Sequence, residues 1–98
     1  MLNEVDTREM HWLATMLDGA NIPYEIRELW GGLQIIYPNG KEFICSVVQH
    51  DFSYGGRNGF LEIMGLLTAE EGENDSVKGW LTAEDVFERI SRHFLENT

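Results

Sequence analysis

The chain has 98 residues, of which 43% are hydrophobic and 11% aromatic, and 17 acidic against 7 basic residues give a formal net charge of −10. This length fits one domain with one core, and the apolar content is too high for a disordered chain. The acidic balance argues against direct binding of nucleic acid or of an anionic membrane. It favours a basic partner or, as the plainer alternative, serves solubility alone.

The N-terminal residues and the cysteine content indicate the cytoplasm. The segment 1–6 (MLNEVD) has no basic stretch followed by an apolar one, so it does not resemble a signal peptide. No apolar run approaches the ~20 residues that a membrane helix needs. The single cysteine, Cys45, excludes an internal disulfide framework and fits a reducing compartment. We therefore expect a cytoplasmic protein without a membrane segment.

The first half of the chain predicts one helix and then three strands. Asp6 and Glu9 have the spacing of a capping box, apolar residues then recur at helical spacing, and Gly19 with Asn21 ends the helix. Period-two alternation and turn residues predict strands over 22–29, 33–37 and 41–49. The last of these is apolar on both faces, which is typical of a central strand.

The second half predicts a short helix over 60–67, an acidic connection over 68–76, a brief strand over 77–81 and a capped helix over 82–97. The predicted fold is therefore α+β, a small single domain over residues 1–98. Its three- to four-stranded antiparallel sheet packs with two main helices and one short helix. The expected core comprises Leu13, Leu17, Ile26, Ile35, Phe43, Cys45, Val47, Leu61, Met64, Val86, Phe87 and Ile90.

The segment 50–59 (HDFSYGGRNG) is the most distinctive stretch of the sequence. Its glycines match neither G-x-x-x-x-G-K-[ST] nor G-x-G-x-x-G, which excludes the well-defined nucleotide-binding motifs. Glycines let backbone N–H groups approach a ligand, Arg57 supplies a guanidinium, and the predicted following helix offers free N–H groups, so an anion site is one interpretation. The other is a connection whose glycines accept positive φ.

Catalytic chemistry has little support in the sequence. Cys45 lies within a predicted apolar strand, where a cysteine is usually an inert small hydrophobe. The three histidines, His11, His50 and His93, are scattered over separate elements without metal-ligand spacing. We therefore expect a protein that is not an enzyme and that holds no cofactor and no metal.

Two sets of residues are predicted to contact a ligand or partner. Trp, Tyr and Arg often anchor interfaces, and together with the glycine loop they give the first set: Trp12, Trp30, His50, Ser53, Tyr54, Gly55, Gly56 and Arg57. The second set is an acidic surface: Glu70, Glu71, Glu73, Asp75, Glu84, Asp85 and Glu88. Trp80 precedes the last helix and is expected to staple it.

The segments 30–39, 50–56, 60–68 and 79–89 resemble a group of short acidic proteins of prophages and conjugative elements in gut Firmicutes, and we expect the resemblance to extend over most of the chain. The resemblance carries no established activity, cofactor or site residues. It implies a protein borne by a phage or mobile element that acts by stoichiometric binding, as anti-CRISPR and other anti-defence proteins do.

The function expected from these observations is inhibition without turnover. The acidic surface would bind the basic groove of an intracellular protein, such as a nucleic-acid-binding effector of host defence. Two alternatives stay open. The loop over 50–59 would sequester a small anionic nucleotide, with a homodimer completing the pocket, or the protein would be a housekeeping protein-interaction module.

Overall fold

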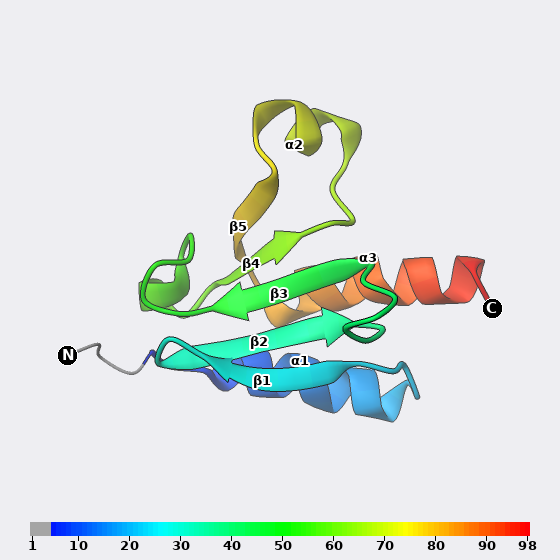
Figure 1. The fold of residues 1–98 in the computed structure, drawn as a ribbon, viewed down its shortest axis with the longest axis horizontal. Helices are drawn as coiled ribbons and strands as arrows, with labels where there is room; N and C mark the ends of the chain where they lie inside the picture. The colour runs from blue at the N-terminus through cyan, green and yellow to red at the C-terminus, as the bar shows by residue number, and fades with distance from the viewer. Residues whose placement is uncertain (1–4) are drawn as a thin grey trace.

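The computed structural model describes residues 5–98, which form one antiparallel sheet whose five strands follow chain order (Figure 1). The strands are β1 (Glu25–Leu29), β2 (Gly32–Tyr37), β3 (Cys45–Gln49), β4 (Leu61–Met64) and β5 (Val77–Leu81). The predicted α+β class is confirmed, and the sheet is slightly larger than the three or four strands expected. Residues 1–4, part of the segment that argued against a signal peptide, lie outside the described range.

Three helices accompany the sheet in the described residues: α1 (Arg8–Gly19), α2 (Ala69–Asn74) and α3 (Ala83–Glu96). A short 3-10 turn, η1 (Gly56–Asn58), lies between β3 and β4. Over residues 5–98, none of the helices combines the length and the apolar character needed to cross a bilayer.

The core lies between one face of the sheet and the pair α1 and α3. Figure 1 shows these two helices side by side behind the sheet, with α1 against β2 and α3 against β4. Leu13 of α1 and Ile90 of α3 are fully buried, as are Ile35 and Val47 of the strands. The structure describes no helix on the opposite face, and α2 is held away from the sheet beyond the ends of β4 and β5.

The strand β3 is central, as its apolar pattern predicts. Val47 lies opposite Ile35 of β2 and Ile63 of β4, and all three side chains are buried on the helix side of the sheet. The strand is shorter than predicted, since it begins at Cys45 rather than at residue 41. Likewise β1 begins at Glu25 rather than at residue 22.

The prediction that Ile26, Phe43 and Met64 belong to the core is wrong. Ile26, Phe43 and Met64 are 44%, 45% and 46% exposed. Ile26 lies on the edge strand β1, Phe43 precedes β3, and Met64 lies on the opposite side of the sheet from its buried neighbour Ile63. Phe87 is only partly buried and packs at the margin of the core.

The predicted helix over 60–67 is a strand, β4. Leu61 and Ile63 are fully buried, whereas Glu62 and Met64 point to the other face, so the side chains follow a period of two. A short apolar run fits either a strand or a buried helix, and its period alone cannot separate them. Gly65 ends the strand at φ 94°, a conformation that favours glycine.

The caps of the first two helices also differ from the prediction. Thr7, not Asp6, precedes α1, and it makes no capping hydrogen bond. Glu9 instead accepts a hydrogen bond from the backbone N–H of Ala83 over 2.8 Å, which joins α1 to the start of α3. Conversely, Thr68 and Glu71 form a complete capping box that starts α2 within the segment predicted as an acidic connection.

Candidate functional site

The first part of the 50–59 loop is closed by its own hydrogen bonds. The Ser53 hydroxyl accepts from the backbone N–H of His50 and donates to its carbonyl, both over 3.0 Å. The Phe52 N–H donates to Nδ1 of His50 over 3.1 Å. The His50 ring packs edge-on against Trp30 at 5.2 Å, and burial lowers its pKa. His50 and Ser53 therefore hold the loop in shape instead of facing a ligand.

Two glycines of the loop are required by close packing. A Cβ on Gly56 would lie 2.2 Å from the carbonyl oxygen of His50. Gly55 has φ 84°, and a Cβ there would also lie 2.9 Å from Cβ of Phe60. Both positions thus need glycine for the loop to fold.

Arg57 is paired within the loop. Its Nε donates to Asp51 Oδ1 over 2.7 Å and its Nη2 to Oδ2 over 3.2 Å, and these hydrogen bonds raise the pKa of the guanidinium. The loop then enters the strand β4, so the helix whose free N–H groups were predicted to attract an anion is not there. The predicted anion site therefore lacks the helix N–H groups, and the Arg57 guanidinium is already paired with the Asp51 carboxylate.

Four aromatic side chains around this loop are more than half exposed. They are Trp30 (60%), Phe52 (64%), Tyr54 (53%) and Trp80 (58%). Trp30 comes from the β1–β2 turn, which lies with the loop at the same end of the sheet in Figure 1. Exposed aromatic side chains in such number are typical of a contact surface.

Trp80 and Phe52 differ from what the sequence predicts. Trp80 does not staple α3, because its ring packs against Phe60 at 5.7 Å and is otherwise exposed. Trp80 and Trp30 both have positive φ, 60° and 47°, which is uncommon for bulky residues. Phe52 was not predicted as a contact residue, although a phenylalanine beside Ser53 in a polar, glycine-rich segment is a signal of exposure.

Trp12 is engaged in a contact between two helices. It is 47% exposed on α1, and its indole N–H donates to Glu84 Oε1 over 2.9 Å. This hydrogen bond joins α1 to the first turn of α3. The structure therefore gives Trp12 a role within the fold and does not bring it to the loop.

The predicted acidic residues are mostly exposed, but several have partners. All but Glu71 are exposed. Asp85 caps α3 by accepting from the Thr82 N–H over 3.0 Å, and Glu88 pairs with Arg92 over 2.5 Å. The carboxylates of α2 and its C-terminal cap, Glu70, Glu73 and Asp75, have no ion-pair partner within residues 5–98. Three carboxylates without an ion pair therefore lie together on α2 and its cap.

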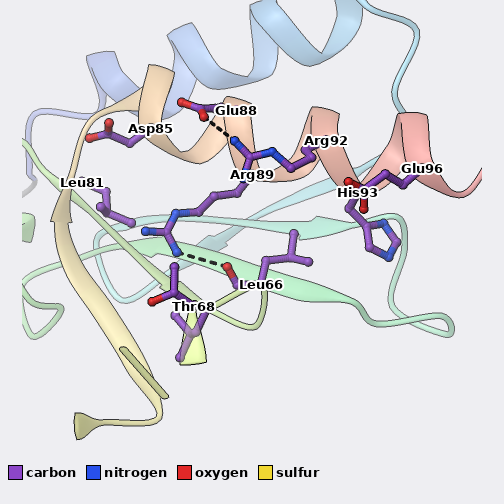
Figure 2. Close-up of a pocket in the computed structure, with 10 residues that line it drawn as sticks. Leu66, Thr68, Leu81, Asp85, Glu88, Arg89, Arg92, His93 and Glu96 are labelled. Carbon is purple, nitrogen blue, oxygen red and sulfur yellow. Dashed lines mark hydrogen bonds and ion pairs between the residues drawn. The ribbon is translucent and has the colours of Figure 1, made fainter. Parts of the chain in front are cut away.

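A groove of about 530 Å³ separates α3 from the segment before α2 (Figure 2). Figure 2 shows Arg89 reaching across it, and its Nη1 donates to the carbonyl of Leu66 over 3.1 Å. The same guanidinium makes two 2.7 Å hydrogen bonds with Glu71, whose pKa falls to about 2 chiefly because of them. The arginines of this groove are thus already engaged, and Arg89 fastens α2 to the body.

Cys45 and His93 are both engaged within the fold. Cys45 is fully buried, and burial raises the pKa of its thiol to about 12. His93 shares a 2.8 Å hydrogen bond with the buried Tyr37. Within residues 5–98, no three His, Cys, Asp or Glu side chains are grouped to hold a metal ion.

Comparisons with models of protein families, with curated proteins and with solved structures find no match. The resemblance to short acidic proteins of mobile elements therefore stays a prediction.

Proposed function

We propose that this protein binds one basic protein partner in the cytoplasm, stoichiometrically and without catalysis. The observation that carries the proposal is the set of four exposed aromatic side chains around the 50–59 loop: Trp30, Phe52, Tyr54 and Trp80. Large exposed apolar patches on small domains mark binding sites, and aromatic side chains contribute much of the energy of protein interfaces.

The charge supports a protein as the partner. Exposed aromatic rings also stack on nucleic-acid bases, but such sites combine them with a positively charged groove. This chain carries a net charge of −10, and α2 holds unpaired carboxylates. A basic protein surface suits both the rings and the carboxylates. A nucleic-acid-binding effector of host defence, inhibited when its basic groove is occupied, is the partner we expect.

The experiment is capture of partners from host lysate with the tagged protein, analysed by mass spectrometry for proteins and for nucleotides. The double variant Trp30→Ala/Phe52→Ala removes two of the exposed rings. The matched control is Leu95→Ala, because Leu95 is 72% exposed near the far end of α3. Circular dichroism and urea unfolding verify that each variant is folded.

The proposal expects a basic protein that binds in a fixed ratio, is retained by Leu95→Ala and is lost with the double variant. A partner held equally well by the double variant would overturn the role of the rings. A co-purifying nucleotide would favour the alternative in which the 50–59 loop sequesters a small anionic nucleotide. Multiple turnover of a captured ligand would overturn the proposal as a whole.

A further inference from the structure

We infer that a second groove, between α2 and the tip of the 50–59 loop, receives an arginine side chain of the partner. The groove encloses about 450 Å³, and its lining includes Tyr54, Trp80, Glu70, Asp75, Lys78 and Gly79. The inference rests on the proposed function and specifies which group of a basic partner is recognised, and where.

The backbone of Tyr54 and the ring of Trp80 are held by neighbouring residues. The backbone N–H of Trp80 donates to the Tyr54 carbonyl over 3.2 Å, which ties the loop to β5. Tyr54 lies so close to β5 that a Cβ on Gly79 would be 2.2 Å from Cβ of Tyr54. Phe60 supports the Trp80 ring from the loop side, at 5.7 Å. The Tyr54 backbone and the Trp80 ring therefore lose little entropy when a ligand enters.

The groove combines these rings with uncompensated negative charge. Glu70, Glu71 and Asp75 line it together with a single cation, Lys78. Glu71 is neutralised by its ion pair with Arg89. The charges left in the lining are the carboxylates of Glu70 and Asp75 and the ammonium of Lys78. This leaves a net charge of one negative unit on the groove.

Aromatic faces beside carboxylates suit a guanidinium better than other common groups. A cation over a Trp or Tyr face is attracted by the ring, and the flat guanidinium also stacks on it while it hydrogen-bonds to a carboxylate. The lysine ammonium is more strongly hydrated and lacks the planar fork. An anion would be repelled by two carboxylates that have no ion pair, and a purely apolar side chain would leave their charges uncompensated.

The probe is the capped peptide acetyl-Gly-Arg-Gly-amide, with acetyl-Gly-citrulline-Gly-amide as the uncharged isostere. Binding is followed in ¹H–¹⁵N spectra, where the three tryptophans give three indole N–H signals. We expect the arginine peptide to shift the Trp80 signal saturably and the Trp30 signal little. The citrulline peptide should bind about two- to thirtyfold more weakly, since a cation–π contact is worth about 0.5–2 kcal/mol.

Matched variants separate this groove from the general acidity of the protein. Glu70→Gln/Asp75→Asn should weaken binding, whereas Glu73→Gln, on the same helix but outside the lining, should not. Lys78→Ala should tighten binding, because it removes the competing cation. Tyr54→Ala should abolish the shift, and urea unfolding verifies that this variant is folded.

The inference is overturned if citrulline binds as well as arginine, if Glu73→Gln weakens binding as much as Glu70→Gln/Asp75→Asn, or if Trp80 does not respond. These outcomes are distinct from failure of the proposed function. A captured basic partner that is insensitive to Glu70→Gln/Asp75→Asn would retain that function and eliminate the groove. If the groove binds arginine but no basic protein is captured, the groove is retained and the proposed function is eliminated.

Discussion

Glu71 and Arg89 form the ion pair that fastens α2 to α3, with both side chains only 19% exposed. Glu71→Gln should lower the free energy of unfolding by about 1–3 kcal/mol at pH 7, because a charged hydrogen-bonded pair is lost in a partly buried place. The same change at the exposed Glu73 is the control and should have little effect. Urea unfolding measures both, and equal losses would contradict the role of the pair.

The pH dependence of this effect follows from the pKa of Glu71. Arg89, and then the backbone N–H of Thr68, lower that pKa from 4.5 to about 2 in the folded state. A lowered folded pKa stabilises the protein fully above about 4.5, and the contribution is lost as the pH falls towards about 2. The difference between wild type and Glu71→Gln should therefore shrink over this interval. If the difference in stability between wild type and Glu71→Gln grows as the pH falls, this prediction is wrong.

At the residue scale, exposed aromatic side chains could be predicted from the sequence. Whether a charged side chain already has a partner within the protein could not. Trp30 and Tyr54 were expected as contacts and are exposed. Arg57 was expected to be free for a ligand, but its partner Asp51 lies six residues earlier, across a loop whose shape depends on close packing at Gly56. Such pairing depends on the folded loop, which residue types alone do not give.

At the element scale, the capping boxes of α2 and α3 offer a matched comparison. Thr68 and Thr82 each accept from the N–H three residues on, but α3 buries Val86 and Ile90 whereas α2 buries no side chain. Thr82→Ala should cost about 1 kcal/mol of global stability. Thr68→Ala loses the same hydrogen bond but should mainly unwind α2, because local opening there exposes little apolar surface.

Urea unfolding and amide hydrogen exchange distinguish these outcomes. Thr82→Ala should shift the unfolding midpoint, and Thr68→Ala should speed exchange in 69–74 with a smaller shift. Equal shifts would mean that α2 unfolds together with the core.

A comparison of α3, β4 and α2 shows why some elements could be predicted from the sequence and others could not. The stripe of Val86 and Ile90 repeats over several turns of α3, so its helical period is clear. In β4, only Leu61 and Ile63 face the core, and two inward residues do not define a period. Thr68 and Glu71 have the spacing of a capping box, but the segment has no apolar stripe, and it was therefore predicted to be a connection.

For the whole molecule, the net charge of −10 acts in opposite directions on stability and on binding. Like charges on a compact protein repel one another, and salt screens them over a distance that falls from about 30 Å at 0.01 M to about 3 Å at 1 M. Raising the salt concentration should therefore stabilise the fold. A gain of about 1 kcal/mol corresponds to a rise in Tm of roughly 4–8 °C for a domain of this size.

The same salt should weaken binding of the arginine peptide, because the attraction of Glu70 and Asp75 for the guanidinium is screened as well. Both effects are measured in the same two buffers, of low and high sodium chloride. Thermal unfolding gives the change in stability, and the Trp80 titration gives the change in peptide affinity. The citrulline peptide is the control, since its affinity should change little. If binding and stability rose together with salt, apolar contact would dominate recognition, and the carboxylates on α2 would have no part in choosing a basic partner.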